Sequence, residues 1–315
     1  ERIFNASGVQ GVDTYILSGN VEIEEIGSSN IDVELQDRSA GNTRIGFVQN
    51  VVSGENDSIN LGLQNIGQVA ALGVSEQIVG VDIADVEILS LTFNGVNVAA
   101  IDTQDVKQIT TNGVGSLKLT GVGTGLKTFD GTLASGDIDV DLKQASAMTA
   151  IQTGTGDDII RTSKSALDVV ALVDGGSGND VLELSGPIGI AEFSIENIET
   201  ISLVGPDSSA TFSSLAASDV ERVIVGSTNA AGEYDFVNLG ERTLAVTSLG
   251  DAAGTLITDN AGALRIDVEA SLNGAGVSNL AILAWEANRV DILVADDARY
   301  AGELTADFAE AFTLS

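Results

Sequence analysis

Two short segments rich in glycine and aspartate contain the residues of this sequence that are best suited to chemistry. The first runs from Thr153 to Arg161 and reads TGTGDDIIR, and the second runs from Gly175 to Glu183 and reads GGSGNDVLE. Glycine lets the backbone adopt positive φ and curl tightly, so that carbonyl oxygens point inward, and aspartate adds charged oxygens. Ca²⁺ takes about six to eight hard oxygen ligands in irregular geometry, so this donor set suits it better than zinc, copper or magnesium.

The spacing of the two segments predicts a metal site. The second segment fits the pattern G-G-x-G-x-D-x-U-x of calcium-binding parallel β-rolls, and the first departs from it only at Thr153. Asp158 and Asp180 are separated by about one coil of a solenoid, so the two turns would stack with a cation between them. An ordinary turn between strands is the alternative, because glycine, asparagine and aspartate are common in turns. We therefore predict Ca²⁺ as the cofactor, with these metal-site residues: Gly154, Thr155, Gly156, Asp157, Asp158, Asp174, Gly176, Ser177, Gly178, Asn179 and Asp180.

The charge of the chain limits its partners. It has 14 basic and 46 acidic residues, a formal net charge of −32, and its basic residues are scattered. Nucleic acid is excluded as a partner, because binding phosphate requires basic patches, and an anionic membrane surface is excluded by the same repulsion. No apolar run reaches the length of about 18 residues that a membrane span needs. The charge also opposes compaction and assembly, and divalent cations would relieve both effects. A halophilic or marine origin would also explain the acidic composition, and it is compatible with calcium binding.

Repeated patterns indicate strands at regular intervals. Stretches such as residues 137–142, DIDVDL, alternate apolar and polar side chains, which predicts half-buried strands. A looser phrase (apolar, charged, any, apolar) begins at Val86 and again at Val106, and it recurs at Ile198 and at Val220. The offset is 20 residues in the first pair and 22 in the second, and 22 residues also separate the two calcium segments. A repeat of about 20–22 residues predicts a solenoid in which each coil buries its apolar face against its neighbours.

We therefore expect an all-β parallel β-solenoid, of the β-helix or β-roll kind. Residues 1–315 would form a single elongated domain with its calcium-binding coils at about 151–185. Because aromatic residues are only 4%, the core must consist of valine, isoleucine, leucine and alanine, which suit a narrow interior. Short helices are expected at 213–217 and 306–311, as insertions or a cap. An antiparallel β-sandwich pair is the rival fold, since it also has short strands about 8–12 residues apart. The start at Glu1, without methionine or a signal peptide, suggests a fragment of a larger protein.

Little in the sequence indicates catalysis. The chain has no histidine and no cysteine, which removes the commonest general base and all thiol chemistry. A glycosidase needs two carboxylates at about 5–9 Å, but acidic pairs are so abundant here that none is informative. Aromatic side chains for stacking on sugars are few, with Trp285 and three tyrosines as the candidates. We predict that the protein is not an enzyme.

The two turns, followed by the phrase FSIENIETISL that starts at Phe193, resemble crystalline surface-layer (S-layer) proteins of Gram-negative bacteria. These proteins are exported by type I secretion and carry repeat-in-toxin (RTX) calcium turns; the resemblance extends to RTX adhesins and exoproteins. It covers about residues 151–205. It implies a right-handed parallel β-solenoid, with the aspartates of the pattern at Asp158 and Asp180 and the turn backbones at Gly154, Thr155, Gly156, Gly176, Ser177 and Gly178. Family members usually carry several tandem nonapeptides, whereas this chain has one full and one partial copy.

The functional hypothesis follows from this resemblance. We expect a secreted, extracellular structural subunit of a bacterial surface layer, which self-assembles with Ca²⁺ into a two-dimensional lattice. Its partners would be copies of itself, with cell-surface polysaccharide as a second candidate, and neither nucleic acid nor an inserted membrane segment. The first alternative is an RTX-type adhesin segment that binds a host or glycan ligand. The second is a β-helix enzyme that modifies polysaccharide.

Overall fold

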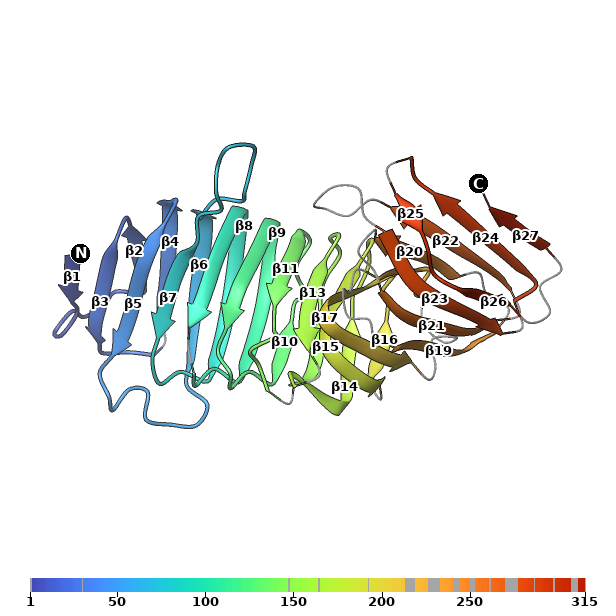
Figure 1. The fold of residues 1–315 in the computed structure, drawn as a ribbon. Coiled ribbons are helices and arrows are strands. Elements are labelled where there is room, and N and C mark those ends of the chain that lie inside the picture. The colour runs from blue at the N-terminus through green and yellow to red at the C-terminus, as the bar shows by residue number, and fades with distance from the viewer. Residues whose placement is uncertain are drawn as a thin grey trace. The chain divides into compact units, whose positions relative to one another are not determined.

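The computed structural model describes most of the chain, and its larger gaps lie after residue 212 (Figure 1). The segment predicted as a helix at 213–217 lies outside the described residues, as do residues 307–310 of the second predicted helix, whose ends Ala306 and Ala311 belong to strands. The described residues are 2–29, 31–102, 104–146, 148–163, 165–191, 193–212, 219–225, 233–240, 244–249, 253–260, 262–269, 277–285, 287–296, 298–306 and 311–314.

The described residues form β-strands joined by turns and loops, and no helix occurs among them. The first strands are β1 (Arg2–Asn5), β2 (Thr14–Ser18), β3 (Val21–Ile26), β4 (Asp32–Arg38), β5 (Gly41–Phe47), β6 (Ser58–Ile66), β7 (Val79–Ile83), β8 (Ile88–Asp102), β9 (Gln108–Val122), β10 (Thr128–Asp130), β11 (Asp137–Asp141), β12 (Met148–Gln152), β13 (Ile159–Ser163) and β14 (Leu167–Asp174). The remaining strands are β15 (Val181–Ala191), β16 (Ser194–Glu196), β17 (Thr200–Phe212), β18 (Arg222–Val225), β19 (Glu233–Gly240), β20 (Leu244–Leu249), β21 (Ala253–Asn260), β22 (Ala263–Glu269), β23 (Val277–Trp285), β24 (Arg289–Val294), β25 (Arg299–Tyr300), β26 (Leu304–Ala306) and β27 (Ala311–Leu314).

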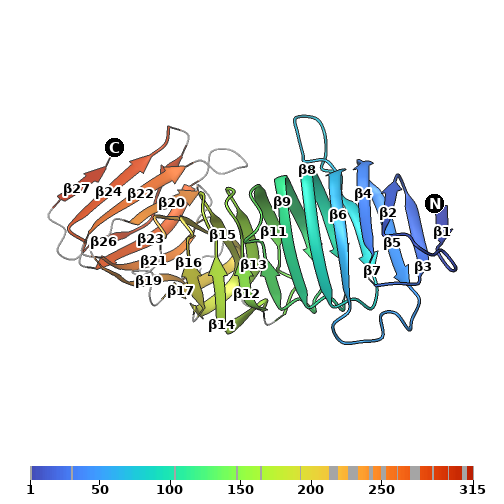
Figure 2. The ribbon, with the colours of Figure 1, turned by 180° about the vertical axis from the view of Figure 1, so that it is seen from behind.

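The strands pair in parallel, mostly with the strand two places away in the sequence. Thus β2, β4, β6 and β8 lie side by side in that order, as Figure 2 shows. The long strand β8 passes through a corner at Gly95, so its first half pairs with β6 and its second half with β7. Parallel neighbours joined by a full circuit of chain make a β-solenoid of about 11 turns, which confirms the predicted all-β solenoid and excludes the antiparallel sandwich.

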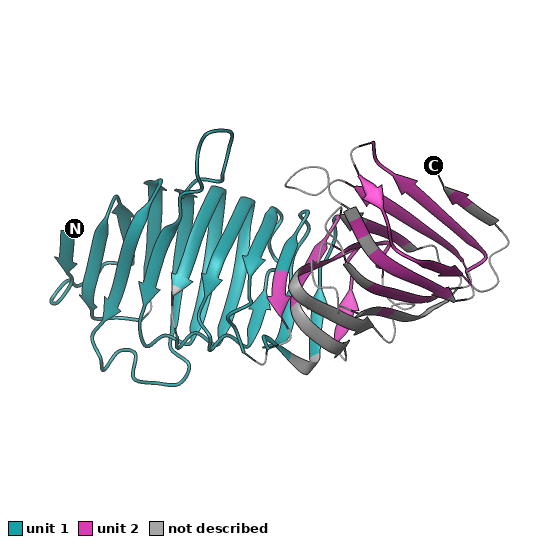
Figure 3. Ribbon diagram, viewed as in Figure 1, with its two compact units in different colours: residues 1–160, 165–178 teal, residues 161–164, 179–315 magenta. Residues whose placement is uncertain are grey.

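The chain divides into two compact units (Figure 3). The first contains residues 1–160 and 165–178, and the second contains residues 161–164 and 179–315. Within each unit the strands stack in the parallel manner just described. The division falls between Gly178 and Asn179, inside the second predicted calcium turn.

A continuous apolar row forms the core of each unit. The strand registers align side chains that are at most 1% exposed, and burying each of them contributes about 1.5–3 kcal/mol. In the first unit the row is Ile59, Leu89, Ile109, Phe129, Ile151 and Val173. In the second unit it is Leu182, Ile201, Val223, Val246, Ile266 and Ile292.

One corner of the first unit requires a left-handed backbone on five successive coils. The residues there have φ between +47° and +98°, and all are of the three types that tolerate this conformation: Gly19, Asp37, Asn65, Gly95 and Gly115. At Gly115 the coils also approach closely, because a Cβ atom added there would lie 2.3 Å from the carbonyl oxygen of Gly95. This corner therefore excludes a side chain at Gly115 for two independent reasons.

We predict that Gly115→Ala destabilises the first unit while Gly121→Ala, on the same strand, does not. A non-glycine residue forced to positive φ costs about 1–3 kcal/mol before the clash with Gly95 is counted. At Gly121 an added Cβ would meet only the Cβ of Ala100, at 4.0 Å, and φ is not positive. Urea unfolding followed by circular dichroism measures both variants, and equal midpoints would show that the corner relaxes without cost.

Candidate calcium-binding turns

Both predicted calcium segments are turns between strands. Residues 153–158 connect β12 to β13, and residues 175–180 connect β14 to β15. The apolar residues that end each nonapeptide begin the following strand, with Ile160 and Leu182 fully buried. The sequence pattern therefore placed each turn and each following strand correctly.

The two turns stack directly within the first unit. The amide of Ser177 donates to the carbonyl oxygen of Gly154 at 2.9 Å, and the hydroxyl of Thr153 donates to the carbonyl oxygen of Gly175 at 2.7 Å. The amide of Thr155 donates in turn to the carbonyl oxygen of Ala134 at 3.2 Å, in the turn of the preceding coil. Three oxygen-rich turns thus lie one upon another.

The glycines of the turns allow the backbones to come this close. A Cβ added to Gly176 would lie 2.1 Å from the carbonyl oxygen of Gly154, and one added to Gly178 would lie 2.1 Å from that of Gly156. Gly176 and Gly178 also have φ of +86° and +148°. The glycine pattern is therefore explained by contact between coils, whether or not a metal binds.

The earlier glycines of this column, at the same corner on the preceding coils, were not among the predicted site residues. A Cβ on Gly136 would lie 2.0 Å from the carbonyl oxygen of Gly115, and Gly115 has the same relation to Gly95. The signal was present as a nearly regular glycine spacing, one per coil, through Gly95, Gly115, Gly136, Gly156 and Gly178. The upstream members lack the aspartates of the nonapeptide, so a search for that pattern passes over them.

Asp158 points into the coil, where its carboxylate binds backbone amides. It is fully buried; Oδ1 accepts a hydrogen bond from the amide of Ile138 at 2.7 Å, and Oδ2 accepts one from the amide of Gly154 at 3.1 Å. Burial raises the pKa of Asp158 above its ordinary value of 3.8, and the amide hydrogen bonds partly oppose this shift. The carboxylate therefore fastens its own turn to the coil before it.

The exposed side chains of the first unit's turns include Thr155, Asp157 and Ser177. The amide of Asp157 donates to Oδ1 of Asp137 at 3.1 Å, which brings two aspartates of neighbouring coils together on the outer surface. Asp174 is partly buried, and its Oδ1 accepts from the amide of Gly176 at 3.0 Å. Adjacent aspartates thus face opposite ways, with Asp157 outside and Asp158 inside.

The other two predicted ligands belong to the second unit. Asn179 is exposed, whereas Asp180 is only 1% exposed. The amide of Asp180 donates to Oε2 of Glu199 at 2.7 Å, and Thr200 donates its amide to the carbonyl oxygen of Asp180 at 3.1 Å. Asp180, like Asp158, therefore lies at a corner that hydrogen bonds connect to a neighbouring coil.

Carboxylates that accept amides from a neighbouring coil recur elsewhere. In the first unit Oε2 of Glu87 accepts from the amide of Asp57 at 3.0 Å, and Oδ2 of Asp105 accepts from the amide of Asp85 at 3.3 Å. Glu87 and Glu199 are the charged residues of the repeated phrase in the sequence. In these two copies of the phrase, the acidic residue supplies an acceptor for the neighbouring turn.

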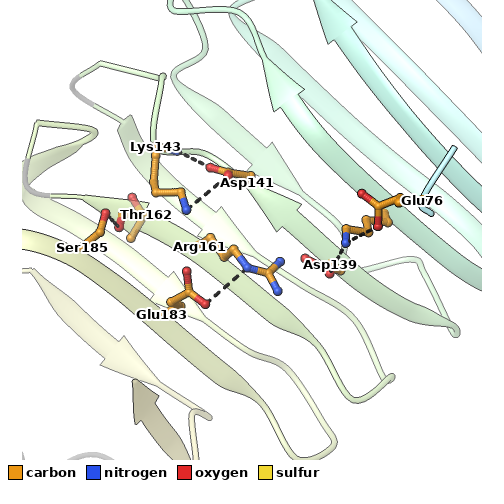
Figure 4. A network of polar contacts seen from close by, with 9 residues as sticks. Glu76, Asp139, Asp141, Lys143, Arg161, Thr162, Glu183 and Ser185 are labelled. Atoms are coloured by element: carbon orange, nitrogen blue, oxygen red, sulfur yellow. Dashed lines mark hydrogen bonds and ion pairs between the residues drawn. The ribbon is translucent and has the colours of Figure 1, made fainter. Parts of the chain in front are cut away.

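Several charged side chains on the strands and loops form ion pairs (Figure 4). In the first unit Lys118 Nζ lies 2.6 Å from Glu76 Oε2 and 3.8 Å from Asp139 Oδ2, and Lys143 contacts Asp141 at 3.3 Å. Within the second unit the corresponding pair is Arg161 with Glu183, at 3.4 Å. Pairs at this exposure contribute about 0–1 kcal/mol each, so they offset charge locally without holding the coils together.

The donor set of the turns consists of carbonyl, hydroxyl and carboxylate oxygens, which is the chemistry Ca²⁺ requires. Among the described residues no group of three or more acidic side chains is arranged to hold a metal ion. Of the predicted site residues, Thr155, Asp157 and Ser177 face outward, whereas Asp158 faces inward. No helix in the part of the chain that the structure describes is long and apolar enough to cross a membrane.

The chain matches no protein-family model, and it has no significant match among curated proteins or solved structures.

We predict that Asp158→Asn destabilises the first unit by about 2–4 kcal/mol, because one of two amides loses an ionised acceptor and faces an NH₂ group instead. Asp157→Asn makes the same chemical change on the exposed neighbour and is expected to alter the free energy of unfolding by less than about 0.5 kcal/mol. Denaturant unfolding with calcium chelated makes the comparison. Similar effects of the two variants would contradict the inward role of Asp158.

A pH dependence follows from the raised pKa of Asp158. The folded protein binds this proton more tightly than the unfolded chain does, so the group adds stability as the pH falls through its raised pKa. The gain is complete below the ordinary value of 3.8 and is lost as the pH rises through the raised pKa. We expect the difference in unfolding free energy between the natural protein and Asp158→Asn to widen as the pH falls in chelator, and pH profiles that stay parallel would show that the pKa is not raised.

Proposed function

We propose that this chain is a structural subunit of a calcium-dependent bacterial surface layer on the outside of the cell. The observation that supports this proposal best is the stack of oxygen-rich turns at 131–136, 153–158 and 175–178 in the first unit, tied by coil-to-coil hydrogen bonds. Within each unit the parallel strands form extended sheet faces, which suit lateral contacts in a lattice. The resemblance of residues 151–205 to RTX surface-layer proteins supports the same function.

Calcium would act electrostatically. The net charge of −32 makes copies of the chain repel one another, and part of this charge is concentrated where Asp137 and Asp157 meet on the outer surface. A divalent ion held there by the two carboxylates and by exposed turn oxygens would cancel the local repulsion. Neutralised turns could then approach a second copy, so that filling of the site and assembly are coupled.

The buried carboxylates have a different part in this proposal. Asp158 already binds two backbone amides, so it orders the turn before any metal arrives. Its negative charge, just inside the turn, adds to the attraction of a cation at the surface. Calcium outside cells is abundant enough to fill weak sites of this kind, which is consistent with an extracellular location.

Calcium titration with electron microscopy tests the proposal. We expect the natural protein to form sheets at millimolar calcium and to disperse when a chelator is added. Asp157→Asn should raise the calcium concentration needed by about tenfold or more, because it removes a charged ligand. The matched control is Asp13→Asn, which removes the same charge from an exposed aspartate in the region of β2, far from these turns along the chain.

The control separates a site from a general effect of charge. If Asp157→Asn and Asp13→Asn shift assembly equally, net charge governs it and no calcium site lies at the turn. A chain that remains folded and monomeric throughout the titration would exclude the surface-layer function.

A further inference from the structure

A small depression lies on the outer face of the sheet formed by β4, β6 and β8, in the first unit. It has a volume of about 160 Å³ and is lined by Glu34, Gly62, Leu63, Gln64, Thr92, Phe93 and Asn94. The strand register explains it. Glu34, Gly62 and Thr92 are aligned across the three strands, as are Gln36, Gln64 and Asn94 in the next outward row. Because glycine occupies the centre of the first row, the sheet face has a gap where a side chain would otherwise stand.

The gap at Gly62 is narrow enough to be filled by one side chain. A Cβ added to Gly62 would lie 3.1 Å from Cγ of Glu34 and 3.5 Å from Oγ1 of Thr92. The φ of Gly62 is not positive, so its conformation does not itself require glycine. The absence of a side chain is therefore what opens the depression.

The walls of the depression carry a mixed set of hydrogen-bonding groups. Glu34 supplies carboxylate oxygens, and one of them, Oε2, is oriented by a hydrogen bond from Nε2 of Gln36 at 2.9 Å. Gln64 and Asn94 supply exposed amide groups, and Thr92 supplies an exposed hydroxyl. Acceptors and donors at this density suit a ligand that carries several hydroxyl groups.

The same rows disfavour anionic ligands. The outward positions aligned with Asp32 on β4 are Asn60 on β6 and Ser90 on β8, and the Nδ2 atom of Asn60 donates to Oδ1 of Asp32 at 2.8 Å. In these rows of β4, β6 and β8 the only charged groups are carboxylates, so an anionic ligand would be repelled. A neutral ligand avoids this repulsion and can form hydrogen bonds with the polar residues of the lining.

The size of the depression indicates part of a larger molecule. A volume of about 160 Å³ is below the range of about 300–1,000 Å³ that holds a whole drug-sized ligand. Uncharged polar residues continue two of the rows onto β9, where Thr110 is aligned with Ser90 and Asn112 with Thr92, and the exposed Val114 continues the third beside Asn94. A chain molecule could therefore place one unit in the depression and lay its neighbours across the adjacent strands.

We propose that this depression binds one sugar residue of a neutral polysaccharide, with Glu34, Gln64, Thr92 and Asn94 as hydrogen-bonding partners. The site lies on a strand face rather than at the calcium turns, and it requires neither metal nor assembly. It is therefore an activity additional to the proposed surface-layer function.

The test uses the full chain, kept monomeric in chelator, and isothermal titration with hexasaccharides of glucose, mannose and galactose, and with a galacturonate hexasaccharide as the anionic probe. We expect at least one neutral hexasaccharide to bind and the galacturonate to bind at least about tenfold more weakly. Gly62→Val fills the depression and should weaken binding by about tenfold or more. Valine suits a strand, and the partly exposed Glu34 side chain must shift by a few tenths of an ångström to admit it, so the unfolding midpoint is measured alongside binding.

Gly46→Val is the matched control. It introduces the same side chain on β5, where an added Cβ would have only ordinary contacts, the shortest at 3.7 Å, and it should bind like the natural protein. Thr92→Val, which removes one exposed hydroxyl, provides a second test should Gly62→Val fold poorly, and it should weaken binding several-fold.

Two results would overturn the proposal: no neutral hexasaccharide binds at millimolar concentration, or the variants at Gly62 and Thr92 bind as tightly as Gly46→Val. Because the sugar titration is done in chelator, a negative result would not contradict calcium-dependent assembly. Failure of assembly equally leaves sugar binding in place.

Discussion

The spacing between parallel coils is the constraint on which the rest of this structure depends. Backbone hydrogen bonds hold neighbouring strands about 4.8 Å apart, and the chain must turn at every corner without widening that step. Gly115 and Gly178 show the consequence, because a Cβ atom at either position would overlap a carbonyl oxygen of the preceding coil. Glycine in the nonapeptides is thus required by stacking, and a calcium site would be an addition to corners that already have this form.

The same constraint gives acidic residues a structural use. A corner leaves backbone amides that cannot join the strand ladder, and a buried unpaired amide costs free energy. Carboxylates of adjoining coils satisfy such amides at Ile138, Asp57 and Asp180. Part of the large negative charge therefore stabilises the fold, although the total charge opposes it.

The sequence was informative wherever a feature depends on neighbouring residues or on a simple repeat. Alternation predicted the strands, and the recurrence of one phrase from coil to coil predicted the solenoid. Features set by the register between coils were not predictable in the same way. The depression at Gly62 exists because Glu34 and Thr92, which lie one coil before it and one coil after it, are aligned with it. The inward direction of Asp158 depends likewise on the amide of Ile138 in the preceding coil.

The doublet Asp157–Asp158 places one carboxylate inside the coil and one on its surface. Successive side chains of extended backbone point to opposite sides, so the second aspartate is buried against amides while the first faces solvent beside Asp137. Removing the buried charge and removing the exposed charge are therefore different experiments, although the residues are adjacent. A loss of calcium response in Asp158→Ala could follow from a disordered turn alone, whereas the same loss in an Asp157 variant that folds normally would identify a ligand.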